Sequence, residues 1–115
     1  MTTSDSTGTT AAVTAAVGRC TARFGHWTPD RWAARAIGAD GPARTRGDVI
    51  HALVQDLADL AADAEGQPRR TVPRLDLALS DQLRVVAADL QSVDPPPTAA
   101  LAAAVARITE ALHAL

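Results

Sequence analysis

Apolar residues recur every three or four positions in four long stretches of this chain, and polar residues separate them. The most regular stretch covers residues 48–64, and its spacing places the apolar side chains on one face of an α-helix. Thr45 and Asp48 stand three residues apart at its start, the spacing of a capping box, and Gly66 follows as a left-handed stop. We predict that this helix is the centre of the core. Its apolar positions are Val49, Ile50, Leu53, Val54, Leu57, Leu60, Ala61 and Ala64.

Three further long helices are predicted by the same spacing, over residues 11–26, 80–94 and 98–115. Ser80 and Thr98 stand at the starts of the last two, where a hydroxyl can cap the first turn. Pro95, Pro96 and Pro97 separate these two helices. The three apolar stripes are Val13, Val17, Cys20, Phe24 and Trp27; Leu83, Val86, Leu90 and Val93; and Leu101, Val105, Ile108, Leu112 and Leu115.

The segments between these helices carry turn and helix-start signals. Thr28 and Pro29 predict the start of a short helix that runs through Ile37 and stops at Gly38, followed by an irregular connection over residues 39–44. Prolines interrupt residues 67–76, which we predict to be an exposed loop with three arginines. Leucines alternate at positions 75, 77 and 79, and we interpret them as an extended lead-in because a lone strand would have no partner.

These elements predict an all-α fold, an antiparallel four-helix bundle with a short extra helix after the first long helix. Residues 1–10 are polar and rich in Thr and Ser, so we expect a flexible N-terminal lead. Residues 11–115 then form a single helical-bundle domain, which is a usual size for one hydrophobic core.

Composition narrows the class of protein only slightly. Aromatic residues make up 3% of the 115 residues, so aliphatic side chains and alanine must fill the core, and the formal net charge is -2. This charge argues against non-specific attraction to nucleic acid or to an anionic membrane. No stretch of about 18 consecutive apolar residues predicts a membrane span, and the lead lacks the features of a secretory signal. The expectation is a cytoplasmic protein whose single cysteine, Cys20, is a buried hydrophobe without a disulfide.

Motifs that carry catalytic or metal chemistry are absent from the sequence. His26, His51 and His113 lie on or beside different helices, so no HxxxH or HExxH pair forms. Neither a GxSxG elbow nor a glycine-rich phosphate loop occurs. The sequence therefore predicts no catalytic residue, no metal site and no cofactor.

Trp32, Arg35 and His51 are the candidate contacts for a ligand or partner. Trp32 lies in a short helix beside two arginines, and an exposed tryptophan in this setting is a common contact residue. The alternative is that Trp32 fills the core. Asp48 and Gln55 lie one turn on either side of His51, so a carboxylate can orient its ring; alternatively, His51 only marks the polar boundary of its helix.

One family resemblance involves residues 28–53. The motif TPDRW, followed by a loop and then by GDVIHAL at the start of a helix, resembles the first half of the DinB and maleylpyruvate-isomerase-like bundles. The resemblance implies a helical-bundle fold. These bundles carry a metal-ligand histidine in the second helix, but the matching position here is Ala52, with His51 beside it on a different helical angle.

The last predicted helix is apolar around most of its circumference, because alanines occupy the side turned away from its aliphatic stripe. Such a helix is usually covered on more than one side. We therefore expect self-association as a homodimer, or binding of another protein, through Ala103, Arg107 and Ala114. The alternative is a small-molecule-binding or enzymatic bundle of the DinB type, with a pocket near Trp32 and His51. Nucleic-acid binding through the three arginines of the loop is disfavoured, because that patch is short and the remainder is acidic.

Overall fold

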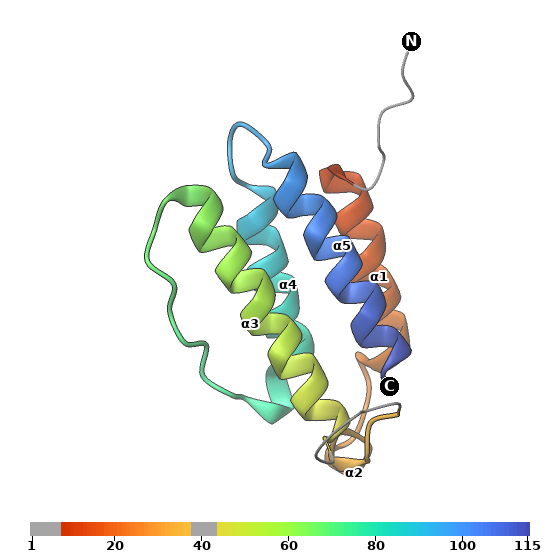
Figure 1. Ribbon diagram of the computed structural model, residues 1–115. Helices are drawn as coiled ribbons and strands as arrows, with labels where there is room; N and C mark the ends of the chain where they lie inside the picture. Colours follow the sequence, from red (N-terminus) through yellow and green to blue (C-terminus); the bar gives the residue numbers. More distant parts are fainter. Residues whose placement is uncertain (1–7, 38–43) are drawn as a thin grey trace.

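The computed structural model describes residues 8–37 and 44–115, and this part of the chain is all-helical, as predicted (Figure 1). Residues 1–7 of the expected lead and residues 38–43 of the expected irregular connection lie outside the described residues. No helix in the described part is long and apolar enough to cross a membrane. The helices are α1 (Thr10–Phe24), α2 (Pro29–Ala33), α3 (Arg46–Glu65), α4 (Leu79–Gln91) and α5 (Thr98–His113), with a 3-10 turn, η2 (Asp76–Ala78), before α4.

Both ends of α3 form as the sequence predicts. The Asp48 N–H donates to Thr45 Oγ1 at 3.0 Å, and the Thr45 N–H donates to Asp48 Oδ2 at 2.9 Å, which closes the capping box. Gly66 terminates the helix with φ of 68°, in the left-handed region that favours glycine. The helix is thus delimited by local interactions that the sequence alone specifies.

The directions of the long helices differ from the simple alternation that we expected. α3 and α4 run in the same direction, and α1 and α5 run in the opposite one (Figure 1). The reason is the path of residues 67–75, here called the return segment. It leaves the C-terminal end of α3, where Arg69 binds Asp63, and reaches the N-terminal end, where Arg74 binds Asp48. α4 therefore starts beside the beginning of α3.

One core joins the four long helices, because α3 and α1 each pack against both α4 and α5. The centre of α3 supplies Leu57, which is fully buried, and α1 supplies Cys20 and Phe24. Phe24 meets Trp27 and Trp32 in an aromatic cluster at the end where α1, α2 and α3 come together. The largest fully buried side chains are Phe24, Ile50, Leu57, Leu79, Leu83, Leu90, Leu101, Ile108 and Leu115.

The short helix α2 ends at Ala33, earlier than the predicted end at Gly38. The chain after it becomes extended and pairs with the residues before α3: the Ala36 N–H donates to the Arg44 carbonyl at 2.8 Å, and the Arg46 N–H donates to the Ala34 carbonyl at 2.8 Å. These backbone bonds replace those that a longer helix would make. They also fix where α3 begins relative to α2.

The predicted caps of α4 and α5 are wrong. α4 starts at Leu79 with Ala78 as its N-cap, so Ser80 lies inside the first turn. Residues 76–78 form the turn η2 instead of the extended lead-in that we expected, and this turn continues directly into the helix. Thr98 is likewise the first residue of α5, preceded by Pro97.

Leu57→Ala tests the assignment of α3 as the core helix. Leu57 is fully buried, so truncation should lower the free energy of unfolding by about 2 to 5 kcal/mol through lost burial and a residual cavity. Urea unfolding measures this change. Val85→Ala on α4 is the control: Val85 is 60% exposed, so its truncation should change stability by less than about 0.5 kcal/mol. Equal midpoints for both variants would contradict the assignment.

Candidate functional site

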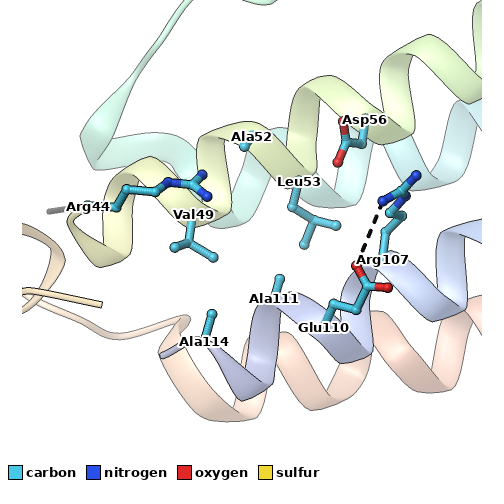
Figure 2. A pocket seen from close by; sticks show the side chains of 9 residues that line it. All are labelled: Arg44, Val49, Ala52, Leu53, Asp56, Arg107, Glu110, Ala111 and Ala114. Carbon is cyan, nitrogen blue, oxygen red and sulfur yellow. Dashed lines mark ion pairs between the residues drawn. The ribbon is translucent and has the colours of Figure 1, made fainter. Parts of the chain in front are cut away.

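A groove of about 330 Å³ lies on the surface where α3 packs beside α5 (Figure 2). Its floor is apolar, because Val49, Leu53 and Ala111 turn their side chains toward the gap. Three of the lining residues are alanines, Ala52 on α3 and Ala111 and Ala114 on α5, and their short side chains leave space between the two helices unfilled. The groove therefore exists because small residues face one another at this point.

Charged side chains of both signs form the rim of this groove. Arg107 and Glu110 lie on α5, with Arg107 Nη1 3.7 Å from Glu110 Oε2. Arg44 stands at the other end, beside Val49, and Asp56 stands across from Arg107 (Figure 2). Within the part of the chain that the structure describes, Arg44 has no carboxylate partner, and Asp56 makes no hydrogen bond or ion pair. Among the described residues, the rim thus has one cation at one end and one anion toward the other that form no ion pair, and the Arg44 guanidinium donates to the Asp48 carbonyl.

The predicted α5 interface residues lie along this groove. Arg107 and Ala114 line it, and Ala103 lies one helical turn before Arg107 on the same edge of α5. Ile37 extends the apolar surface at the end near Ala114. Its N–H donates to the Ala114 carbonyl at 2.7 Å, while the residue is 64% exposed.

The predicted contact residues Trp32, Arg35 and His51 are not brought together into one pocket. Trp32 is only 7% exposed and packs edge-on against Phe24 and Trp27, with ring centroids 5.1 Å away in both cases. It lines two surface pockets, and His51 lines neither of them. Arg35 is exposed. The structure thus places Trp32 in the core, the alternative that the sequence left open.

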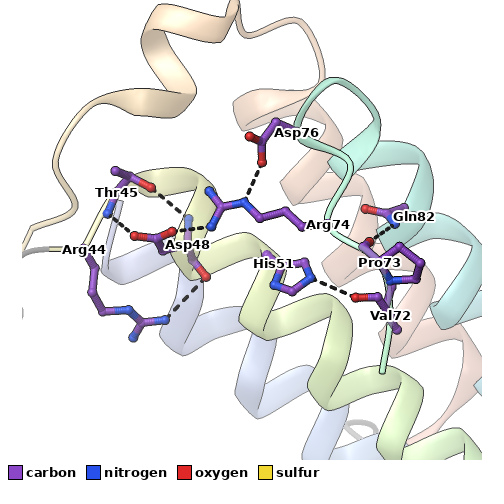
Figure 3. A network of polar contacts seen from close by, with 9 residues as sticks. All are labelled: Arg44, Thr45, Asp48, His51, Val72, Pro73, Arg74, Asp76 and Gln82. Atoms are coloured by element: carbon purple, nitrogen blue, oxygen red, sulfur yellow. Dashed lines mark hydrogen bonds and ion pairs between the residues drawn. The ribbon is translucent and has the colours of Figure 1, made fainter. Parts of the chain in front are cut away.

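His51 has a structural partner on the return segment. Its Nε2 lies 3.2 Å from the Val72 carbonyl oxygen, which can only accept, so Nε2 donates (Figure 3). Gln55, one turn further along α3, accepts the Val72 N–H at 2.8 Å and donates to the Arg70 carbonyl at 2.9 Å. The side chains of α3 therefore bind the backbone of the return segment much as a neighbouring strand would. Sequence analysis missed this role of Gln55, because its partners lie on a loop whose path the sequence does not specify.

Ion pairs accompany these backbone bonds at both ends of the segment. Arg69 makes two bonds to the Asp63 carboxylate, at 3.0 and 2.6 Å. Arg74 lies between Asp48, at 2.5 Å, and Asp76, at 2.6 Å (Figure 3). The loop is exposed, as predicted, but two of its three arginines are held by the helix beneath them.

The pKa values of Asp48 and Cys20 are shifted in opposite directions, each with a clear cause: hydrogen bonds favour the Asp48 carboxylate, and burial favours the Cys20 thiol. The Thr45 backbone N–H, and next the Arg74 guanidinium, lower the pKa of Asp48 to about 2. Burial raises the pKa of the Cys20 thiol to about 11, so the thiol stays protonated and unreactive at neutral pH. Among the described residues, no group of three or more His, Cys, Asp or Glu side chains could hold a metal ion.

Comparison with known proteins finds no match to this chain among protein families, curated protein sequences or solved structures.

Gln55→Glu tests the backbone contacts of the return segment. The new carboxylate can still accept the Val72 N–H, but it cannot donate to the Arg70 carbonyl or to Asp59, and it adds a negative charge beside Asp59. We expect a loss of about 1 to 3 kcal/mol in urea unfolding. Gln67→Glu makes the same change of charge at an exposed position and should be within about 0.5 kcal/mol of the parent protein. An equal loss in both variants would mean that charge, and not the hydrogen bonds, is responsible.

Asp48→Asn tests the charge at the start of α3 through the pH dependence of stability. Because the pKa of Asp48 is lowered on folding, its carboxylate stabilises the protein above the unfolded value of about 3.9, and this contribution is lost as the pH falls toward about 2. The melting temperature of the variant should lie below that of the parent protein at neutral pH. The difference between the two melting temperatures should disappear between about pH 4 and 2.

Arg74→Gln separates the two causes of that shift. This substitution removes the guanidinium but keeps the Thr45 bonds, which are the larger cause of the lowered Asp48 pKa. When Asp48→Asn is made in the Arg74→Gln protein, the loss in melting temperature should therefore be smaller than in the parent protein, but it should not disappear. A gap that stays constant down to the lowest pH would show that the charge of Asp48 contributes nothing to stability.

Proposed function

We propose that this chain is a small helical interaction module, a four-helix bundle that self-associates as a two-fold homodimer through α5 and the groove between α3 and α5. The observation that carries this proposal is the groove itself, which combines an apolar floor with a rim where, among the described residues, one cation and one anion form no ion pair. Apolar centres with polar rims are typical of protein–protein interfaces. Two-fold pairing is the commonest assembly of soluble proteins.

The rim charges favour a second copy of the same chain over an unrelated partner. Arg44 precedes α3, and Asp56 lies ten residues after Arg46, the first residue of α3, which is about 15 Å further along the helix axis. In an isologous interface both copies use the same surface, so a residue at one end of the surface meets a residue at the other end on the second copy. A two-fold axis across the middle of the groove therefore brings Arg44 of each copy to Asp56 of the other. Two ion pairs then flank one apolar contact. Exposed Ile37 adds apolar area at both ends of the same interface.

Shape supports the proposal as well as charge. The small side chains of Ala52, Ala111 and Ala114 let the backbone of an approaching helix come close to the floor of the groove. The edge of α5 continues past Arg107 to Ala103, so the small-residue surface extends for a further turn. An aliphatic side chain from a second copy can occupy space that this chain leaves unfilled.

The alternative of a small-molecule-binding or enzymatic bundle remains a prediction of the family resemblance. Its expected pocket would have to join Trp32 with His51, and the two pockets that Trp32 lines do not contain His51. The interaction module is therefore the function that the described geometry supports best.

Charge reversal tests the proposed interface. Arg44→Asp and Asp56→Arg should each weaken dimerisation, because each places like charges opposite one another, by roughly tenfold or more in the dissociation constant. The double variant should restore it, because both ion pairs form again with their signs exchanged. Sedimentation velocity over a range of concentrations measures the association.

Two controls make this result specific. Arg19→Asp lies on an exposed position of α1 outside the groove and should leave association unchanged. Ala103→Glu, on the edge of α5, should weaken association while the circular dichroism spectrum stays helical. A parent protein that sediments as a monomer at high micromolar concentration would defeat the proposal, and single variants that associate like the parent would exclude this groove as the interface.

A further inference from the structure

The face of α3 beneath the return segment binds an extended chain through its backbone. Gln55 and His51 together make three hydrogen bonds to the backbone of residues 70 and 72, two of them to Val72. Bonds to backbone groups do not depend on the side chains of the bound segment. Any extended chain that lies in the same register can therefore make these three bonds.

Carboxylates on the same face of α3 bind basic residues on either side of these backbone bonds. Asp59 and Asp63 bind Arg69, and Asp48 binds Arg74. These three acids follow the length of α3, so the face presents negative charge at both ends of the bound segment. A chain with arginine at each end fits this arrangement, since guanidinium groups bind carboxylates through two bonds at once.

Between the two arginines, one apolar side chain enters the protein. Val72 is half-buried and packs against the core, next to a groove of about 470 Å³ between α3, α4 and the return segment. Ala58, Ala61 and Ala62 on α3 and Val86 on α4 supply small apolar side chains to its lining. Glu65 and Asp89 add carboxylates, and the return segment itself adds Gln67, Pro68 and Arg70. Val72 leaves much of this groove unfilled, so a larger aliphatic residue at the same place would bury more apolar surface.

We propose that this face of α3 is a binding site for an extended peptide segment of another protein, one with a large aliphatic residue between two arginines, and that the return segment occupies the site when no partner is present. The site lies on a different face of α3 from the groove with α5. The return segment has the advantage of being tethered, which gives it a high effective concentration. The partner has the advantage of a larger side chain, which fills the groove better.

The test uses the full-length protein and two labelled peptides. One peptide copies residues 69–75, Arg-Arg-Thr-Val-Pro-Arg-Leu, and the other has leucine in place of the valine. Binding is measured by fluorescence anisotropy to the parent protein and to a variant with Arg69→Ala and Arg74→Ala. This double variant weakens the tethered competitor and leaves the acids of α3 in place. Circular dichroism establishes that it remains helical.

We expect both peptides to bind the double variant roughly tenfold more tightly than the parent, because the site is available only in the fraction of molecules whose return segment is released. The leucine peptide should bind about fourfold more tightly than the valine peptide, the gain from one additional buried methylene group. Gln55→Glu, added to the double variant, should weaken binding of both peptides roughly tenfold, because the bond to the carbonyl at the Arg70 position is lost. Equal affinity for a third peptide with aspartate at the valine position would overturn the proposal.

A second measurement needs no peptide. Val72→Leu in the intact protein should raise its midpoint of thermal unfolding, because the added methylene enters the groove, and a lowered midpoint would show that the groove cannot take a larger side chain. Absence of peptide binding to a folded double variant would also overturn the proposal. Sedimentation of the double variant tests whether a second copy of the chain binds the site instead. A dimer that persists after peptide is added would show that two copies exchange their return segments, and it would overturn the proposal of a foreign peptide.

Discussion

The arrangement of the helices depends on the hydrogen bonds between α3 and the return segment, residues 67–75. The Gln55 carboxamide accepts the N–H of Val72 and donates to the carbonyl of Arg70, and His51 adds a bond to the Val72 carbonyl. An exposed loop can satisfy its backbone groups with water, so its path is usually loosely determined. Here side chains of a rigid helix replace water at three backbone groups of Arg70 and Val72. The loop therefore follows one course, antiparallel to the helix, and delivers the chain to the N-terminal end of α3.

The course of the return segment decides the arrangement of the remaining helices. A short turn after Gly66 would have sent α4 back antiparallel to α3, as consecutive helices with short connections normally run. Instead α4 starts beside the aromatic cluster, where Leu79 lines a surface pocket together with Phe24, Trp27 and Trp32. It then runs parallel to α3, and Gln91 near its end bonds to Thr10 and Thr14 at the start of α1. The connection after α4 is short, so α5 turns back between α1 and α3 and completes the core.

The sequence predicted what local interactions determine, and it failed where the determinants are distant. The capping box of Thr45 and Asp48 and the stop at Gly66 involve residues three or four positions apart, and both are confirmed. Gln55 and His51 look like an ordinary polar edge in the sequence, since their partners lie 15 to 21 residues away. Ser80 has the right chemistry for a cap, yet η2 already leads into the helix. Of the residues that line the groove, the sequence pointed only to Arg107 and Ala114 on α5. The remaining lining residues, among them Val49, Leu53 and Asp56, were not predicted, because only the packing of α3 against α5 brings the two sets together.

The two sides of α3 differ in how completely their polar groups are satisfied. On the side of the return segment, Asp48, His51, Gln55, Asp59 and Asp63 all have partners within the chain. On the side that faces α5, Asp56 has none among the described residues, and it stands on the rim of the groove. A ligand can bind the face covered by the return segment only if it binds more strongly than that segment does. At the groove, any partner that supplies a complementary charge forms a new ion pair. The groove is therefore where association should occur first, and the face beneath the return segment is where a specific peptide would have to compete.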